Sequence, residues 1–564
     1  MESVDLSSPY FILAAVVALA IGVFASMGAG RTRKKLRARL LAEWGQPHEQ
    51  QREMSAISAY HESLVGAADD SGSVDDRTWD DLELDRVFAW ADRTESAVGQ
   101  QRLYRRLRMP VTTLDPDFDD LVGRLGSDAE WRLRLQLSLN RGRSRAGWDL
   151  WRLTDPEFLV PERWYVIVPL LTLTVVASFC IAPWHPAALL VAVAILLANF
   201  IARARIGWTI GLVVVPFRQL GPLLTIAADL GAPGAESLGS LSERLREPLP
   251  ALRRLRRIAW WLGRGGPSGN ELLAALYEYL NLFFLLDANA IYFGARELRA
   301  QAGHVAKVIA AVGDVDVALC VASIRAEAPT WCRPEFVTSA AHAVMAGVRH
   351  PLVVGAVANT VEFGPLRGLI VTGSNMSGKS TFLRTVGINA VLATTLGTCL
   401  AERYVAPPFR VRSCIGREDD LSAGKSYYLV EVESVLQRVR ESAQPEPTLF
   451  LFDELFRGTN TIERIAAGEA VLRALIDVGH EHIVLAATHD ADLVALLDGE
   501  YLAVHFDERV TSTGLTFDYL LKPGPATTRN AIALLRLQGA PPELVVAADA
   551  RAAALDAERL RRRN

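Results

Sequence analysis

The chain has 564 residues, 50% of them hydrophobic, and its charged side chains leave a formal net charge of −4. This balance excludes a protein that is basic overall, so any nucleic-acid binding has to come from local patches. The length predicts three or four domains, and the hydrophobic share favours membrane segments. The five cysteines are scattered without a CxxC spacing, which disfavours a disulfide framework or zinc site and is typical of reduced cytosolic thiols.

The first apolar run covers residues 10–29 and has no charged residue, so it is long enough for a membrane-spanning helix. A basic stretch at 31–39 follows at once, whereas the residues before the run are acidic or neutral. By the positive-inside rule, the N-terminus lies outside and Arg31 onward lies in the cytoplasm. The alternative is a cleaved signal peptide, which the lack of positive charge before the run disfavours.

A second apolar block covers residues 164–203 and is interrupted by Pro-Trp-His-Pro at 183–186. We expect two spans, at about 164–182 and 187–203, joined by a tight external turn. Arg-rich stretches lie on both flanks, so both flanks face the cytoplasm. The alternative is a helical hairpin buried in a soluble core. Together the patterns predict a multi-pass protein of the inner or plasma membrane with three spans and an external N-terminus.

The pattern of hydrophobic residues in the remaining sequence changes along the chain. Residues 79–111 and 270–327 carry apolar side chains at helical spacing. From Val344 onward, short runs rich in Val, Ile and Leu alternate with helical stretches, which is typical of an α/β domain with a mainly parallel sheet. We therefore predict a C-terminal α/β domain preceded by an all-α region that contains transmembrane helices.

A glycine-rich motif follows the buried-strand pattern at 368–372. The stretch Gly373-Ser-Asn-Met-Ser-Gly-Lys-Ser380 fits G-x-x-x-x-G-K-S and precedes a helical segment, the strand–loop–helix context that a P-loop requires. Its glycines let backbone N–H groups close around phosphate oxygens, and the helix N-terminus adds positive potential. Lys379 would reach the β- and γ-phosphates, and Ser380 would coordinate Mg²⁺. The expected ATP-binding residues are Gly373, Ser374, Asn375, Met376, Ser377, Gly378, Lys379, Ser380 and Thr381.

Two further buried-strand patterns end in polar residues. The first ends in Asp453, which suits a second contact to Mg²⁺, and Glu454 beside it suits orienting or deprotonating the attacking water. The second ends in His489, which could sense the γ-phosphate. The alternatives are two acids that merely end a strand and an ordinary core or surface histidine. A polar loop at 419–426 contains Lys425, a rare lysine in an Arg-rich chain, but alone it would be an ordinary loop.

Together these motifs resemble the MutS family of ABC-type ATPases. The P-loop resembles that family's TGPNMGGKST, the segment from Asp453 resembles DEIGRGTST, and residues 419–433 resemble DDLASGRSTFMVEM. Matches to the family also occur at Thr488-His489, Arg349-His-Pro351, Asn359 and the tail segment 529–541. Weaker matches to its helical core occur at 84–111, including Asp92-Arg-Thr94 and Gly99, and at 314–319.

The resemblance implies an ATPase that uses ATP and Mg²⁺ at a composite site of a homodimer. Glu454, His489 and Lys379 would be the catalytic residues, and Ser380 and Asp453 would hold Mg²⁺. Ser426, with Lys425, would reach the partner subunit's ATP, and the resemblance places His505 near the adenine. The implied domains are an N-terminal transmembrane helix (1–30), a cytosolic helical region that starts the core-like domain (31–163), a transmembrane hairpin (164–203), a helical lever (204–335) and the ATPase domain (336–564).

The departures from the family pattern leave two functions open. No mismatch-reading motif occurs in the first 80 residues, little room for a DNA clamp remains between 206 and 270, and Ala356 replaces an aromatic next to the base. One hypothesis is a membrane-anchored ATPase coupled to DNA and related to mismatch repair. The alternative is an ATP-driven switch that acts on a protein partner without DNA. The clusters at 253–257 and 559–563 could contact DNA or the membrane surface. An ABC transporter is disfavoured because the LSGGQ loop is missing.

Overall fold

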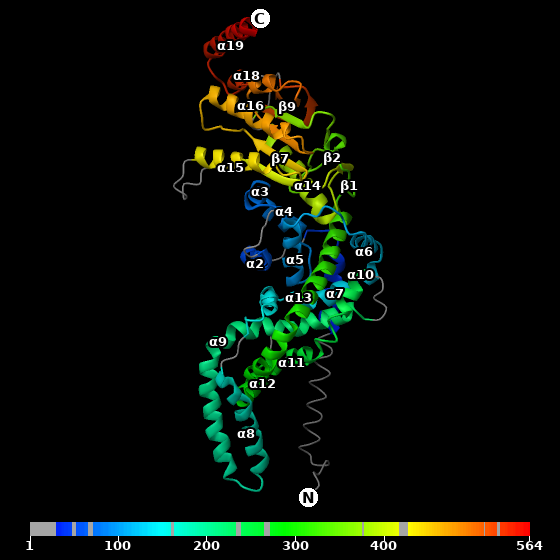
Figure 1. The fold of residues 1–564 in the computed structure, drawn as a ribbon, viewed down its shortest axis with the longest axis vertical. Coiled ribbons are helices and arrows are strands. Elements are labelled where there is room, and N and C mark those ends of the chain that lie inside the picture. Colours follow the sequence, from blue (N-terminus) through cyan, green and yellow to red (C-terminus); the bar gives the residue numbers. More distant parts are fainter. Residues whose placement is uncertain are drawn as a thin grey trace. The chain divides into compact units, whose positions relative to one another are not determined.

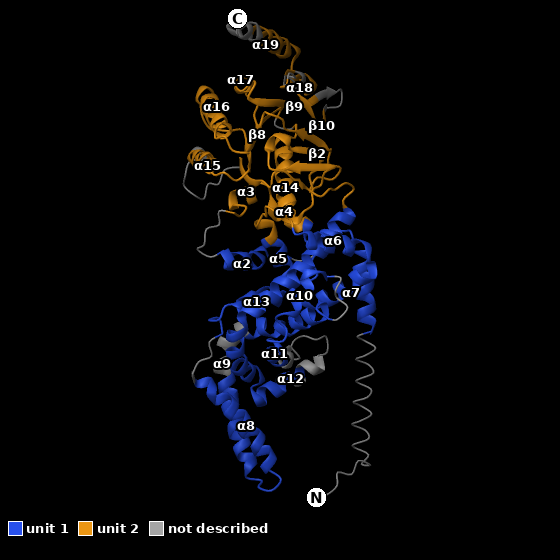
Figure 2. Cartoon of the chain, turned by 45° about the vertical axis from the view of Figure 1, so that its right-hand side comes forward, with its two compact units in different colours: residues 1–66, 91–105, 115–327 blue, residues 67–90, 106–114, 328–564 orange. Residues whose placement is uncertain are grey.

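The computed structural model describes residues 30–47, 52–65, 72–159, 163–232, 238–263, 271–374, 377–416, 427–511, 514–526 and 531–563. The chain divides into two compact units, shown in blue and orange in Figure 2. Unit 1 comprises 1–66, 91–105 and 115–327, and unit 2 comprises 67–90, 106–114 and 328–564. The predicted span at 10–29 and the loop residues Lys425 and Ser426 lie outside the described residues.

Unit 1 is helical throughout its described residues, and two helices of more than 40 residues organise it. A helical stretch at 30–42 precedes the labelled helices. These are α2 (Met54–Val65), α5 (Ala97–Arg108, whose last turn belongs to unit 2), α6 (Pro116–Ser127), α7 (Ala129–Leu139), α8 (Ile167–Ile181), α9 (Ala188–Leu230), α10 (Ser240–Arg246), α11 (Arg253–Gly263), α12 (Glu271–Phe284) and α13 (Leu286–Glu327). Short 3-10 helices lie at η1 (Asn140–Gly142), η2 (Arg145–Thr154) and η3 (Arg163–Val166).

A buried carboxylate joins the long helix α13 to the start of α5. Asp316 accepts hydrogen bonds from the amides of Glu95 and Ser96, at 2.9 and 2.8 Å, and from the Ser96 hydroxyl at 2.5 Å. Burial raises the pKa of Asp316 to about 7, although these donors lower it. Gly99 leaves the space for this carboxylate, because a Cβ there would lie 2.1 Å from Asp316 Oδ2.

The α8–α9 hairpin projects from the rest of unit 1 in Figures 1 and 2. Its apolar side chains face outward, since Leu173 is 65% and Leu190 is 74% exposed, unlike a hairpin buried in a soluble core. Among the described residues, one helix, Trp164–Ile181, is long and apolar enough to cross a membrane, and Ala188–Arg203 is a shorter apolar helix. The helix that contains this second apolar segment continues beyond it, because α9 extends to Leu230.

Polar side chains of the hairpin fix it to the break between α12 and α13. At this break Leu285 adopts a positive φ of 47°. Thr172 of α8 donates to the Phe284 carbonyl at 2.8 Å, and Asn199 of α9 donates to the Phe283 carbonyl at 2.7 Å. The last carbonyls of α12 are thereby satisfied by the hairpin, which makes the hairpin part of the packed unit.

Unit 2 contains the predicted α/β domain. Its main sheet has the order β10-β9-β4-β8-β7-β6, and every neighbouring pair is parallel except β9 and β10. The strands are β4 (Gly368–Thr372), β6 (Arg410–Ile415), β7 (Thr448–Asp453), β8 (Ile483–Ala487), β9 (Tyr501–Thr511) and β10 (Gly514–Pro523). A smaller sheet has the order β1-β5-β2-β3, with β1 (Glu335–Phe336), β2 (Val344–Val348), β3 (Asn359–Glu362) and β5 (Arg403–Ala406).

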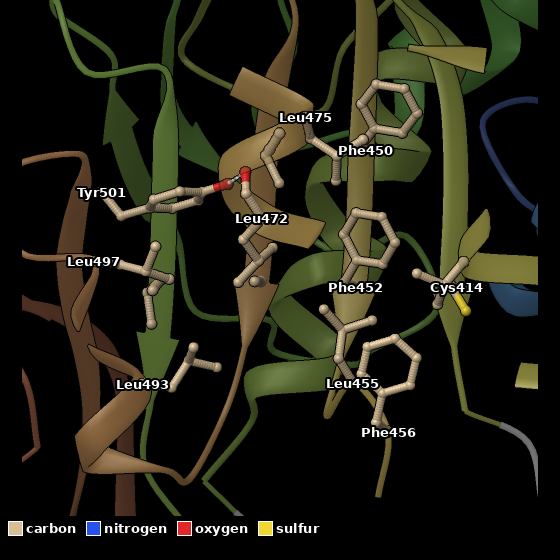
Figure 3. Packing of buried hydrophobic residues seen from close by; sticks show 14 of the residues in the cluster. Cys414, Phe450, Phe452, Leu455, Phe456, Leu472, Leu475, Leu493, Leu497 and Tyr501 are labelled. Carbon is tan, nitrogen blue, oxygen red and sulfur yellow. Dashed lines mark hydrogen bonds between the residues drawn. The ribbon is translucent and has the colours of Figure 1, made fainter. Parts of the chain in front are cut away.

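Helices cover the main sheet and close its core. They are α14 (Lys379–Leu396), α15 (Tyr427–Glu441), α16 (Thr461–Asp477) and α17 (Ala491–Leu496), followed by α18 (Ala531–Leu537) and α19 (Pro542–Arg563); a 3-10 turn, η5, lies at Ala340–His342. In the core drawn in Figure 3, Phe450 and Phe452 of β7 pack with Leu472 and Leu475 of α16, and the hydroxyl of Tyr501 donates to the Leu472 carbonyl. The buried strands therefore form a rigid support for the loops at their carboxyl ends.

A segment from far upstream completes unit 2. Helices α3 (Asp76–Asp81) and α4 (Leu84–Ala91, whose last residue belongs to unit 1) precede α5 in sequence, and α3 packs against β6 at the edge of the main sheet. Asp81 accepts hydrogen bonds from the Ser413 hydroxyl at 2.8 Å and the Ile415 amide at 2.9 Å. The upstream segment thereby covers the free edge of β6.

The space at Gly99 gives a test of the unit 1 core. We expect Gly99→Ala to lower the free energy of unfolding by about 2 kcal/mol or more, because the new methyl group displaces the hydrogen-bonded Asp316. Gly123→Ala is the matched control: it also lies inside a helix, but nothing lies within 4 Å of its Cβ position. There alanine should be neutral or stabilising by about 0.5–1 kcal/mol. Chemical unfolding that shows the same change for both variants would contradict this packing.

Candidate functional site

The glycine-rich loop (residues 373–380) leads from the carboxyl end of β4 into α14. Gly373 has φ of 140°, and a Cβ there would lie 2.6 Å from Ser377 Oγ and 3.0 Å from the Phe506 carbonyl. Gly378 has φ of 104° and lies directly before the first residue of α14. Both glycines are therefore required by the backbone path. The expected ligands Asn375 and Met376 lie outside the described residues.

Lys379 lies across this loop. Its Nζ donates to the carbonyls of Gly373 and Ser374, both at 2.8 Å, and the residue is only 2% exposed. Burial lowers the pKa of Lys379, whereas the nearby carboxylates of Glu454 and Asp453 raise it. The loop thus holds a desolvated cation at the place where the motif predicts contact with phosphate oxygens.

Two oxygen atoms of the kind that coordinate Mg²⁺ lie close together at the start of α14. The hydroxyl of Ser380 donates to Asp453 Oδ2 at 2.5 Å, which joins the loop to the end of β7. Burial raises the pKa of Asp453, although the bond from Ser380 and the charge of Lys379 lower it. A hydroxyl and a carboxylate this close fit Mg²⁺, which usually takes one or two protein oxygens and completes its shell with water and phosphate. Among the described residues, no cluster of three or more His, Cys, Asp or Glu suited to a metal occurs.

Glu454 and His489, the two residues at the ends of β7 and β8 that the sequence analysis expects to be catalytic, lie together beside this pair. Glu454 adopts a positive φ of 49°, and its amide donates to the Ala487 carbonyl of β8 at 3.0 Å. Its two carboxylate oxygens lie 3.4 Å from His489 Nδ1 and 3.4 Å from Arg457 Nε. Glu454 is nearly buried and His489 is half exposed, so the carboxylate lies inside the site and the imidazole at its rim.

A carboxylate of α15 holds the turn that follows Glu454. Glu431 Oε1 accepts a hydrogen bond from the Phe456 amide at 2.6 Å, and Phe456 has a positive φ of 58°. Burial raises the pKa of Glu431, whereas the bond from Phe456 lowers it. Helix α15 begins at Tyr427, directly after the loop that contains Ser426. Glu431 was part of a recognised motif, but its pattern did not reveal this bond.

The strands β9 and β10 border the loop on its other side. His505 pairs with Thr372 across the parallel strands β9 and β4, next to Gly373, and its Nδ1 lies 2.9 Å from the Gly524 carbonyl. Glu508, which the sequence analysis did not single out, accepts a hydrogen bond from the Ser374 hydroxyl at 2.5 Å. The structure thus brings the predicted His505 to the beginning of the loop and adds Glu508 as an anchor of its second residue.

Comparisons with known proteins match the same part of the chain. The family model described as MutS domain V matches residues 369–556. The chain is 35% identical over 266 residues to the DNA mismatch repair protein MutS of Thermus thermophilus, which covers 46% of this chain and 31% of the relative. It is 35% identical over 248 residues to the protein of that name from Geobacillus thermodenitrificans, covering 42% of this chain and 26% of the relative.

By its C-terminal half, the chain belongs to the MutS family. A further relative, the DNA mismatch repair protein MutS of Natronomonas pharaonis, is 32% identical over 262 residues, which are 45% of this chain and 30% of the relative. The chain therefore spans about a third of the length of the curated relatives it matches. The family assignment rests on the unit that contains the glycine-rich loop, β7 and β8.

Two of the MutS-like matches upstream of the loop have structural roles in this chain. Arg349 donates to the Ala356 carbonyl at 2.5 Å, and its own carbonyl accepts from Asn389 at 3.1 Å. Burial lowers the pKa of His350 to about 4, so this imidazole is neutral near pH 7. Asn359 bonds to the backbone of β10, donating to the Tyr519 carbonyl and accepting from the Leu521 amide.

The bond from Phe456 to Glu431 gives a test of how the site is supported. In Glu431→Ala we expect the Phe456 amide to exchange hydrogen about 10- to 100-fold faster, since a charge-assisted bond to a buried carboxylate is lost. Glu431→Gln keeps an acceptor oxygen and should show a smaller increase. Glu433→Ala removes an exposed carboxylate from the same helix and serves as the control. Unchanged exchange at Phe456 in Glu431→Ala would contradict the support role.

Proposed function

We propose that this MutS-family chain binds ATP with Mg²⁺ and hydrolyses it at a site completed by a second copy of the chain. The main support is the arrangement at the carboxyl ends of β4, β7 and β8. There Ser380 and Asp453 form one oxygen pair, while Glu454 and His489 lie together beside it. The names of the relatives support a connection with DNA mismatch repair.

The residues divide the work of phosphoryl transfer among themselves. Lys379 exchanges its hydrogen bonds to the loop carbonyls for bonds to the β- and γ-phosphate oxygens. Neutral acceptors are thereby replaced by negatively charged ones, which bind the ammonium group more strongly. Ser380 and Asp453 would hold Mg²⁺, which supplies positive charge to the phosphate oxygens. Glu454 orients the attacking water and accepts its proton, and His489 at the rim contacts the γ-phosphate.

Completion by a second copy is what the MutS resemblance implies for the segment that leads into α15. Ser426, with Lys425, ends the segment before α15 and would reach the partner's ATP. Glu431 connects α15 to the turn after Glu454. When Ser426 of one copy engages the partner's ATP, the change would be transmitted through α15 and Glu431 to the Glu454 of its own site. ATP would close the dimer and hydrolysis would open it.

The role of Glu454 can be tested by its closest uncharged analogue. Glu454→Gln should bind ATP normally but hydrolyse it about 10²- to 10⁴-fold more slowly, because the amide cannot accept the proton of water. The variant should also accumulate as an ATP-bound dimer. Glu463→Gln, at an exposed position on α16, should keep the wild-type rate. Wild-type hydrolysis by Glu454→Gln would show that another group acts as the base.

Anchorage in the cell membrane is the second part of the proposal. It is supported by the outward-facing apolar residues of the α8–α9 hairpin and by the predicted span at 10–29. By the positive-inside rule, the basic residues on both flanks of the hairpin favour a tip outside the cell and an ATP site in the cytoplasm. The predicted arrangement is therefore a multi-pass protein with three spans and an external N-terminus.

The orientation can be read from cysteine labelling at the exposed hairpin tip. In a Cys180→Ser background, His185→Cys should react with a membrane-impermeant maleimide added to intact cells from outside. The matched control is Glu243→Cys on α10, which is equally exposed but should react only after the membrane is opened. Labelling of His185→Cys only after opening would place the tip inside the cell and overturn the orientation.

Coupling to DNA is the third part, with action on a protein partner as the alternative. Arg253, Arg254, Arg256 and Arg257 of α11 are exposed, while Leu255 on the other face of the helix is buried. A row of exposed guanidinium groups on a packed helix can contact phosphates of a duplex. The cluster at 559–563 carries the same charge, but its side chains lie outside the described residues.

Salt dependence separates these two functions. If DNA is the partner, duplex binding by the full chain should weaken steeply with salt, and neutralising Arg253 and Arg256 to Gln should lower the log–log slope by about two. Arg440→Gln, an exposed arginine on α15, is the control and should leave the slope unchanged. No binding even at low salt would exclude DNA coupling and favour a protein partner.

A further inference from the structure

Tyr519 occupies an unusual place beside the glycine-rich loop. It has a positive φ of 52°, a conformation that a bulky side chain rarely adopts, and it is 46% exposed. It lies where the register of β10 against β9 shifts, between Phe517 and Leu521. A bulge re-aims a side chain, and bulges are enriched next to functional sites. The position of the Tyr519 ring is thus set by a local departure from the regular strand.

The bulge is held from outside the hairpin by Asn359 of β3. Its side-chain amide donates to the Tyr519 carbonyl at 3.0 Å, and its oxygen accepts from the Leu521 amide at 2.8 Å. One side chain therefore satisfies one backbone group within the bulge and one at its end. This clamp explains how the strained conformation persists without burial of the aromatic ring.

The ring reaches the loop that would hold the triphosphate. A Cβ at Gly378 would lie 3.4 Å from Tyr519 Cδ1, so the tyrosine is in contact range of the residue directly before Lys379. The ring also stacks with Phe517, with ring centroids 5.6 Å apart and planes inclined by 22°. Tyr519 is therefore a supported aromatic surface next to the phosphate site and still half open to solvent.

We propose that Tyr519 is the surface on which the base of the bound nucleoside triphosphate stacks. Aromatic stacking accepts any base, because each has a flat π-face, so this contact does not distinguish adenine from guanine. The proposal rests on the proposed triphosphate site and adds the base-binding part of that site. In this arrangement Asn359 is a positioning residue, because it acts on the base through Tyr519.

The test compares ATP with inorganic tripolyphosphate, which carries the phosphates without a base. In the full chain, Tyr519→Ala should weaken ATP binding about 10-fold and GTP binding to a similar extent, as expected for one lost stacking contact. Tripolyphosphate affinity should stay at the wild-type value. Tyr519→Phe and Tyr519→Trp should restore ATP binding. Tyr279→Ala, which removes an equally large, exposed tyrosine from α12, is the control and should bind all three ligands normally.

Each other result has a distinct meaning. ATP affinity unchanged in Tyr519→Ala would overturn the stacking surface while leaving the ATP site intact. Equal weakening of ATP and tripolyphosphate would also overturn it, because Tyr519 would then act by shaping the loop. If neither ligand binds to the wild-type chain, the proposed function itself fails. Unfolding midpoints equal to that of the wild-type chain would show that the variants are folded.

Discussion

The hydrogen bond from Ser380 to Asp453 is the contact on which the candidate site depends. It joins residues 73 positions apart in sequence, one at the start of α14 and the other at the end of β7. The bond forms because β4 and β7 are parallel members of one sheet, so their carboxyl ends meet at the same edge. Lys379 and Glu454 are the sequence neighbours of this pair, and they are brought together by the same geometry.

A second constraint is backbone strain that side chains outside the loops hold in place. Glu454, Phe456 and Tyr519 all have positive φ values although none is glycine. Glu431 holds the Phe456 amide, and Asn359 holds the backbone around Tyr519. Such conformations persist only where surrounding groups fix them, and they concentrate at functional sites. The site is therefore shaped by carboxylate and amide anchors as much as by the residues expected to touch ATP.

Sequence patterns predicted the parts of the fold that local rules determine. The strands that precede Gly373, end in Asp453 and precede His489 follow from buried apolar runs, and they occur where expected. Tertiary contacts decided the rest. The packing of α3 against β6 depends on buried Asp81, and the bulge at Tyr519 depends on Asn359. Neither contact leaves a periodic signal along the chain.

A residue that belongs to a recognisable motif can also have a structural role that the motif does not predict. Gly99 was noted as part of a weak family match, and the structure shows that it leaves space for the carboxylate of Asp316. Arg349 and His350 were noted as part of a family match upstream of the P-loop, and the structure shows that Arg349 supports the backbone and that His350 is a buried, neutral imidazole. In both cases the pattern located the residue, but only the packing explained it.

The central claim is an ATP site shared between two copies, and mixing two inactive variants tests it most directly. Lys379→Ala should be inactive because the chain loses its own phosphate contact, and Ser426→Ala because it cannot complete the partner's site. Random mixing of separately tagged copies should restore about a quarter of the wild-type rate, since half of the dimers are mixed and each holds one intact site. Purified mixed dimers without activity, or full activity of Ser426→Ala alone, would contradict the account.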